Sequence, residues 1–182
     1  MIRTARESDA SGIQAIYGPV VSSTAISFEY EVPSVEEMAS RIRKTLPQYP
    51  WLVCEKEGKI AGYAYAGPFR TRAAYQWCAE VTVYVGAEFR KQGVARELYE
   101  TLFGYLRELG YCRAVAGITL PNPASVAAHE ALGFRKVGVF AKLGFKQGAW
   151  HDVGFWELEL RERPKEPEPP KRWSDFEPGR VH

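Results

Sequence analysis

The sequence predicts a single α/β domain, of the α+β kind, with a mixed sheet that carries helices on both faces. Segments with helical periodicity alternate with strand-like segments early in the chain, and strands dominate late in the chain. With 182 residues, 46% of them hydrophobic, the chain can bury one proper core. One domain is therefore expected over residues 1–160.

The N-terminal segment predicts a short strand followed by two helices. Residues 2–5 form the strand, and Ser8 or Asp9 can cap a helix that ends near Gly18-Pro19. Ser34 and Glu37 have the spacing of a capping box, in which each side chain accepts from the other's backbone N–H. A second helix is expected from there to about residue 46.

The next segment is typical of a β-hairpin followed by a loop. Residues 51–55 and 60–66 are strand-like and are separated by Glu57-Gly58, a turn signal. Residues 67–77 form a loop rich in aromatic residues and arginine. This loop leads directly into the next strand.

Residues 80–110 combine a strand, a turn and an amphipathic helix. Val81, Val83 and Val85 alternate with polar or aromatic residues, which suits a half-buried strand. Apolar residues recur at spacings of three and four from Val94 to Leu109, and Gly110 supplies the usual stop. The rest of the chain is expected to be organised around this unit.

Strands predominate in the last part of the domain. Residues 112–118, 135–140 and 153–160 are strand-like, with a short helix after Asn122 and a loop before the last strand that carries Lys146, Trp150, His151 and Asp152. Residues 161–182 contain five prolines and eleven charged residues, so an extended or disordered tail is expected. Trp173 and Phe176 are candidates for docking on the domain or on a partner subunit.

The turn at residues 90–95 is a candidate phosphate site. The first N–H groups of a helix have no partner inside it and carry the positive end of the dipole. Gly93 allows close approach of a pyrophosphate, and Arg90 and Lys91 add charge. An ordinary strand-to-helix connection with solvated basic residues is the alternative. The spacing is neither that of a P-loop nor that of a dinucleotide fold.

The pattern Arg90-x-x-Gly93-x-Ala95 after a valine-rich strand resembles the acetyl-CoA pyrophosphate loop of the GNAT N-acetyltransferases. The segment from Asn122 to Leu132-Gly133-Phe134 is similar to the family's next motif. This resemblance implies the GNAT fold, with a mostly antiparallel central sheet, and acetyl-CoA as co-substrate. The implied cofactor-binding residues are Val83, Tyr84, Val85, Arg90, Lys91, Gln92, Gly93, Val94, Ala95, Asn122 and Ser125.

Within that superfamily, four segments look like the phosphinothricin and methionine sulfoximine acetyltransferases. They are residues 49–53, 62–68, 79–85 and 144–156, of which the last is the most specific. The resemblance implies transfer of acetyl from acetyl-CoA to the α-amino group of a small amino-acid analogue by direct attack. It also implies a homodimer.

Acetyl transfer to an amine requires a neutral amine, a polarised thioester carbonyl and a proton for the leaving thiolate. On its residues alone, Glu80 reads as a solvated acid at a strand start, but the resemblance implies that it is the base, directly or through water. His129 stands where many GNAT enzymes carry a tyrosine thought to protonate the sulfur, and the phosphinothricin branch has a histidine there. A helix-face histidine without a catalytic part is the alternative.

The acceptor site is expected to combine guanidinium groups with aromatic walls. Arg70 and Arg72 can bind a carboxylate bidentately. Aromatic side chains would line the pocket, although aromatic residues more often belong to the core. An acidic side chain would bind the polar end of the acceptor. The candidates are Phe28, Glu29, Arg70, Arg72, Tyr75, Trp77 and Lys146, the last on the loop before the final strand.

Composition excludes several other classes of function. Lys and Arg number 24 against 22 acids, which gives no basic field for nucleic acid. Cys54, Cys78 and Cys112 are widely spaced without a C-x-x-C pair, so we expect no metal site and a reducing compartment. Neither a signal peptide nor a transmembrane stretch is evident. A cytoplasmic protein that avoids membranes is expected.

Two other functions remain open. Another primary amine, such as a protein N-terminus, a polyamine or an aminoglycoside, could be the acceptor, although a polycation would favour an acidic pocket and the acceptor loop carries arginines. A non-catalytic acetyl-CoA-binding sensor would keep the loop at residues 90–95 and lose nothing on replacement of Glu80 or His129.

Overall fold

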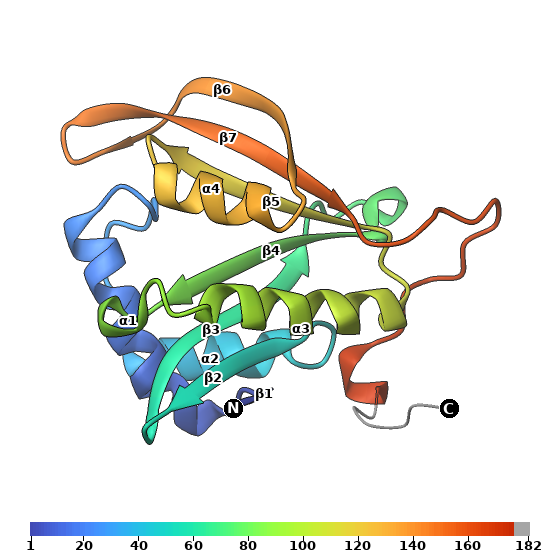
Figure 1. Ribbon diagram of the computed structural model, residues 1–182, viewed down its shortest axis with the longest axis horizontal. Coiled ribbons are helices and arrows are strands. Elements are labelled where there is room, and N and C mark those ends of the chain that lie inside the picture. The colour runs from blue at the N-terminus through green and yellow to red at the C-terminus, as the bar shows by residue number, and fades with distance from the viewer. Residues whose placement is uncertain (177–182) are drawn as a thin grey trace.

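The computed structural model describes residues 1–176, which form a seven-stranded sheet in the order β1-β2-β3-β4-β5-β7-β6 (Figure 1). The strands are β1 (Ile2–Thr4), β2 (Trp51–Lys56), β3 (Lys59–Pro68), β4 (Cys78–Val85), β5 (Arg113–Leu120), β6 (Arg135–Lys146) and β7 (Ala149–Glu159). The helices are α1 (Ala10–Ser23), α2 (Val35–Thr45), α3 (Val94–Leu109) and α4 (Pro123–Ala131). The predicted mixed, mostly antiparallel sheet with flanking helices is confirmed.

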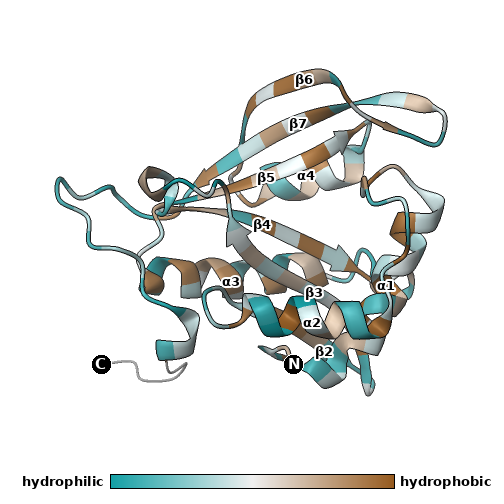
Figure 2. Cartoon of the chain, turned by 180° about the vertical axis from the view of Figure 1, so that it is seen from behind, coloured by the Kyte–Doolittle hydropathy of each residue, from teal (hydrophilic) through white to brown (hydrophobic). Residues whose placement is uncertain are grey.

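Alternation along the strands sends apolar side chains to two layers on opposite faces of the sheet. On β2, Leu52 and Cys54 join the cluster around α3, whereas Trp51 and Val53 join the cluster around α1 and α2. Figure 2 shows α1 and α2 in front of the sheet and α3 behind it. Each face therefore has its own core, and the strands contribute to both.

The sheet is split between its two central strands. β4 and β5 are the one parallel pair within residues 1–176, and only Cys78, Ala79 and Glu80 of β4 have partners on β5. Beyond Glu80 the two strands separate, while β4 stays paired with β3 and β5 with β7. The backbone groups on the facing edges therefore lack ladder partners there and are available to a ligand or to water.

Helix α1 continues past the point where the sequence predicted its end. The helix runs to Ser23 with Pro19 inside it, although proline lacks the N–H that an interior position needs. Val20 and Val21 are buried in the last turn, and the Thr24 hydroxyl donates to the Val20 carbonyl at 2.6 Å. Burial of that turn outweighs the lost hydrogen bond, which local sequence signals could not show.

The two predicted N-caps have different outcomes. The Ser34 hydroxyl accepts from the N–H of Glu37 at 3.1 Å, which confirms the start of α2. Asp9 precedes α1 without capping it through its side chain. Its carboxylate accepts instead from both terminal guanidinium nitrogens of Arg3, at 2.7 and 2.8 Å, and from the N–H of Arg6. The charge-assisted bidentate pair is the stronger interaction.

The last two strands are longer than predicted and form a tight hairpin. The predicted loop at residues 146–152 is wrong, because β6 extends to Lys146 and β7 begins at Ala149. Gln147 and Gly148 have φ values of 52° and 75°, as a two-residue hairpin turn requires. Exposed side chains on both strands hide the alternation that would have revealed them. The predicted β2–β3 hairpin, which turns at Glu57-Gly58, is confirmed.

Residues 161–176, which we call the strap, run from the end of β7 back to the C-terminal end of α3 (Figure 1). Trp173 is 6% exposed and packs on Tyr105 with ring centroids 5.0 Å apart. The N–H of Lys171 donates to the Leu109 carbonyl at 2.8 Å. The final part of the predicted tail, residues 177–182, lies outside the described residues.

We expect Trp173→Ala to lower the free energy of unfolding by about 3 kcal/mol, because it removes a buried indole and leaves a cavity beside Tyr105. Chemical denaturation measures the change. The same substitution at Trp150, which is 60% exposed, serves as the matched control and should shift stability much less. Equal stability of Trp173→Ala and the unmodified protein would show that the strap contributes nothing to the fold.

Candidate active site

A cleft of about 410 Å³ opens where β4 and β5 separate. Its walls come from the two strands, from the loop between α1 and α2, and from α4. Among the predicted site residues, this cleft brings together Phe28, Glu29, Glu80, Val83, Tyr84, Asn122, Ser125 and His129. Side chains that are distant in the sequence therefore meet at the split in the sheet.

Glu80 and His129 reach this cleft from opposite faces of the sheet. Val81 belongs to the apolar cluster around α3, so the neighbouring Glu80 points to the face covered by α1 and α2. His129 lies on α4 and contacts Tyr99 of α3, which places it on the other face. The cleft thus passes through the sheet and has a different ionisable group on each side.

Glu80 occupies the last residue pair of the β4–β5 ladder and is half-buried. Burial raises the pKa of its carboxyl, and the charge of Arg70 opposes this shift. A Cβ atom on Gly117 of β5 would lie 3.9 Å from Glu80 Oε1, so the glycine leaves space beside the carboxylate. A carboxylate with a raised pKa is a better proton acceptor.

His129 is 5% exposed, and its partners fix its tautomer. Nδ1 lies 2.8 Å from the Ser125 carbonyl oxygen, which can only accept, so Nδ1 carries the hydrogen. Nε2 lies 3.1 Å from the Tyr99 hydroxyl and accepts from it. Burial lowers the pKa of His129, so the resting imidazole is neutral at pH 7.

Tyr99 is a site residue that sequence reasoning missed. It is part of the apolar stripe of α3 and is 1% exposed, yet its side chain lines the cleft. Burial raises the pKa of its hydroxyl far above the usual value. The one available signal was a hydroxyl within an otherwise apolar helix face, and only the three-dimensional contact with His129 gives it meaning.

The wall on the α1–α2 side is a hydrogen-bonded network. The Tyr17 hydroxyl contacts Ser27 Oγ and donates to Glu29, each at 2.7 Å. Arg41 donates to both carboxylate oxygens of Glu29 at 2.7 and 2.9 Å, and this pairing lowers the pKa of Glu29. Glu29 therefore lies at the cleft as an ionised group that is already neutralised by Arg41.

The other predicted acceptor residues lie outside this lining. Lys146 is buried and donates to two backbone carbonyls, and the Trp77 indole donates to the Glu168 carbonyl of the strap, so neither points into the cleft. Tyr75 is 43% exposed, and Arg70 stacks over the Phe69 ring at 4.6 Å. Arg72 is also exposed. The predicted pocket roles of Lys146 and Trp77 are corrected by this geometry.

The loop at residues 90–95 has the geometry of an anion site. Gly93 adopts a left-handed conformation with φ of 82° immediately before α3. The first backbone bond of the helix runs from the Glu97 N–H to the Gly93 carbonyl, at 3.0 Å. The N–H groups of the three residues between them therefore precede the helical ladder and remain available to an anion.

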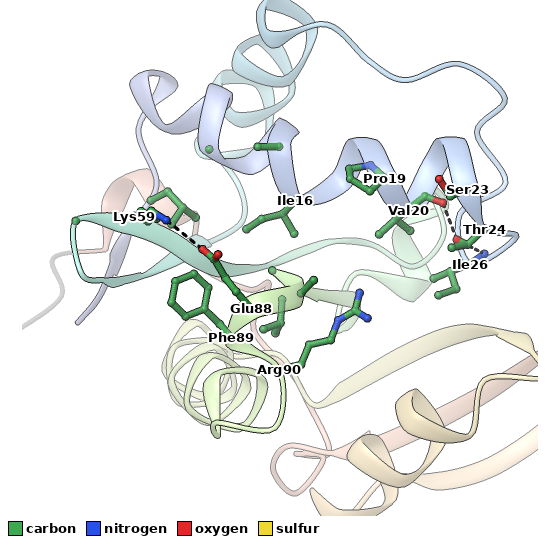
Figure 3. A pocket seen from close by; sticks show the side chains of 17 residues that line it. Ile16, Pro19, Val20, Ser23, Thr24, Ile26, Lys59, Glu88, Phe89 and Arg90 are labelled. Atoms are coloured by element: carbon green, nitrogen blue, oxygen red, sulfur yellow. Dashed lines mark hydrogen bonds and ion pairs between the residues drawn. The ribbon is translucent and has the colours of Figure 1, made fainter.

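A second cleft, of about 800 Å³, is lined by α1, by the turn between β2 and β3, and by the segment after β4 as far as Arg90, the first residue of this loop. Ile26 lines both clefts, and β4 continues from one into the other at Val85. In Figure 3, Arg90 reaches into this space below Val20 of α1, while the Lys59–Glu88 ion pair, 3.5 Å long, lies toward the other end. We call these two neighbouring clefts, which together are lined by residues from Glu80 to Arg90, the trough.

Comparison with known proteins identifies the family of this protein. Residues 2–154 match the family model described as an acetyltransferase (GNAT) domain. The chain belongs to the GNAT acetyltransferase family.

Several relatives of this GNAT protein are similar over nearly their whole length. It is 39% identical to the phosphinothricin N-acetyltransferase of Streptomyces viridochromogenes, over 92% of this chain and 91% of the relative. It is 33% identical to the L-methionine sulfoximine/L-methionine sulfone acetyltransferase of Salmonella typhimurium, over 88% and 95%. The crystal structure of a phosphinothricin acetyltransferase from Sinorhizobium meliloti with AcCoA superposes with a TM-score of 0.87, at 33% identity, over 95% and 97%.

These comparisons confirm the predicted enzyme class and co-substrate: the protein is an acetyl-CoA-dependent N-acetyltransferase. Within residues 1–176, no group of three or more His, Cys, Asp or Glu side chains is arranged to hold a metal ion. No helix in the described part of the chain is long and apolar enough to cross a membrane.

We expect Glu80→Gln to stabilise the protein at neutral pH. Burial raises the pKa of Glu80 above its ordinary value of 4.5. The contribution of Glu80 to the free energy of unfolding is therefore lost as the pH rises from 4.5 through the raised pKa. The glutamine variant escapes that loss. Its melting temperature should therefore equal that of the unmodified protein near pH 4, exceed it by a growing margin as the pH rises from 4.5 to the raised pKa, and keep a constant advantage above that pH.

Glu108→Gln, an exposed change on α3, is the control and should show no such pH-dependent gain. A Glu80→Gln variant that is less stable at pH 7.5 would mean that Glu80 has a stabilising partner when ionised.

Proposed function

We propose that this protein transfers the acetyl group of acetyl-CoA to the α-amino group of a small amino-acid analogue of the phosphinothricin or methionine sulfoximine type. The observation that carries the proposal is the position of Glu80, at the end of the β4–β5 ladder and facing a small cleft. Relatives that are 39% and 33% identical are named for these two acceptors. Direct attack by the amine is the proposed route.

Glu80 is the proposed base for the amine. An α-ammonium group is largely protonated at neutral pH and must lose a proton before it can attack. The half-buried carboxylate faces the acceptor side of the cleft, where Ser27 and Phe28 form the opposite wall. The raised pKa of the Glu80 carboxyl lies closer to the pKa of the ammonium group than an ordinary carboxyl pKa does. Glu80 can therefore accept the ammonium proton more readily, either directly or through one water.

The trough suits the co-substrate, which supplies a thioester carbonyl. The free N–H groups at the start of α3, with Arg90 and Lys91 beside them, would hold the pyrophosphate. The unpaired edge of β4 at Val83, Tyr84 and Val85 would hold the pantetheine arm and the acetyl carbonyl, with Gln92, Asn122 and Ser125 alongside. Asn122 also caps α4, because its Oδ1 accepts from the Ser125 N–H at 3.1 Å.

We propose that His129 acts on the leaving sulfur through Tyr99. At rest, Nε2 accepts from the Tyr99 hydroxyl, so neither group offers a proton to the cleft. Once His129 takes up a proton from solvent, Nε2–H donates to the Tyr99 oxygen and frees the Tyr99 hydrogen. As the carbon–sulfur bond breaks and the carbon–nitrogen bond forms, Tyr99 gives its proton to the thiolate and takes the one from Nε2.

The proposal includes a homodimer in the cytoplasm. The β6–β7 hairpin carries large exposed apolar side chains, which a second copy of the chain would cover: Val137, Val139, Phe140, Leu143, Phe145 and Trp150. Sedimentation at several protein concentrations tests the dimer. Cys54, Cys78 and Cys112 are free thiols, which supports a reducing compartment.

Thiol release from acetyl-CoA, measured with a panel of acceptors, tests the proposed function. Turnover should be confined to phosphinothricin and methionine sulfoximine and should be absent with polyamines, aminoglycosides and N-terminal peptides. Glu80→Gln should lower kcat/KM for the amine by at least about 10²-fold while acetyl-CoA still binds. Turnover of another amine alone would replace the acceptor assignment. Binding of acetyl-CoA without any turnover would favour a sensor.

Tyr99→Phe and His129→Asn should each lower kcat by about 10²-fold with the same acceptor, because each removes one member of the proposed proton path. Since the two groups act in series, the double variant should be no slower than the slower single variant. Losses that multiply in the double variant would show that the two side chains act independently.

A further inference from the structure

The end of β6 is attached to the loop between α1 and α2 by a buried ammonium group. Lys146 is 4% exposed, and its Nζ donates to the carbonyl oxygens of Val21 at 2.6 Å and Ser27 at 2.7 Å. Both partners are neutral backbone groups more than 100 residues away in the chain. A buried charge is costly, so these contacts must be well formed to keep it there.

The first contact closes the C-terminal end of α1. Val21 lies in the last turn, where the final four carbonyls of a helix lack partners inside it. The Thr24 hydroxyl takes the carbonyl of Val20, and Lys146 takes the next one. A cation at this position also interacts favourably with the negative end of the helix dipole. Lys146 therefore helps to fix where α1 ends and the loop begins.

The second contact holds the part of the loop that forms the cleft wall. Ser27, whose carbonyl accepts from Lys146, also bonds Tyr17 through its hydroxyl. Phe28 and Glu29 follow it, and all three line the cleft opposite Glu80. The position of this wall therefore depends on an ammonium group that itself lies outside the cleft.

The β6–β7 hairpin supports the same wall through a second contact. The Phe28 ring lies directly over Gly144 of β6, where no Cβ atom would fit, and its centroid is 6.3 Å from that of His151 of β7. His151 in turn donates from Nε2 to the Lys146 carbonyl at 3.0 Å. Gly144 of the hairpin thus contacts Phe28, and His151 of the hairpin fixes the backbone of Lys146.

We propose that Lys146 is a positioning residue for the amine acceptor, which it serves by holding Ser27, Phe28 and Glu29 at the distance from Glu80 that a small amino-acid analogue requires. The proposal rests on the function proposed above. It predicts that loss of the ammonium group weakens the use of the amine and leaves acetyl-CoA binding unchanged, because the groups proposed to hold acetyl-CoA, at the start of α3 and on the free edge of β4, are not among the hydrogen-bond partners of Lys146.

Lys146→Met, which keeps the length of the side chain and removes its charge, is the test variant. Lys142→Met is the matched control, since this lysine is exposed on the same strand. We expect Lys146→Met to raise the KM for the amine at least tenfold, with the acetyl-CoA dissociation constant within twofold of the unmodified value. Lys146→Arg, which can still donate to two carbonyls, should recover part of the loss.

Hydrogen–deuterium exchange of residues 21–30, measured without any substrate, tests the attachment independently of turnover. Faster exchange in Lys146→Met but not in Lys142→Met, together with the raised KM, supports the proposal. Unchanged exchange overturns it, and so does faster exchange with an unchanged KM. If the unmodified protein acetylates no amine in the panel, the proposed function fails and the positioning role fails with it, while the exchange data still decide whether Lys146 holds the loop.

Discussion

A parallel ladder of three residue pairs joins β4 to β5, and the positions of the groups in the cleft follow from where this ladder ends. Antiparallel partners hold the outer edge of each strand over most of its length, so the separation beyond Glu80 costs no other part of the sheet its hydrogen bonds. The gap exposes backbone groups that a ligand can pair with. It also gives side chains from both faces access to one space.

Burial acts on the two ionisable groups of the cleft in opposite directions. It raises the pKa of Glu80 and lowers that of His129, because a low-dielectric environment disfavours the charged form of each. The acid is thereby made a better proton acceptor, and the imidazole is kept neutral at rest. Because the two groups lie on opposite faces of the sheet, the amine and the leaving sulfur can be served by separate proton carriers.

The sequence was most informative where structure is determined locally. The strand and helix at residues 80–110 and the Ser34 cap depend on periodicity and on neighbours within a few residues, and these predictions are confirmed. The full β6–β7 hairpin was missed because its exposed side chains show no alternation, and the end of α1 because burial of its last turn is not visible locally. The place of Lys146 depends on contacts across more than 100 residues. Tyr99 was missed for a similar reason. Its place on the apolar stripe of α3 is that of a core residue, and only its contact with His129 in the folded protein shows that it belongs to the site.

The split in the sheet coincides with a single point in the chain. Residues 1–110 supply β1–β4 with α1–α3, and residues 111–160 supply β5–β7 with α4, so a cut after Gly110 would give two fragments that each keep their own strand pairings. Contacts between the two parts include the three residue pairs of the β4–β5 ladder, the hydrogen bonds of Lys146 to Val21 and Ser27, and the packing of Trp173 on Tyr105. The two sides of the cleft are therefore joined in the chain by one connection, between α3 and β5, and otherwise by these non-covalent contacts.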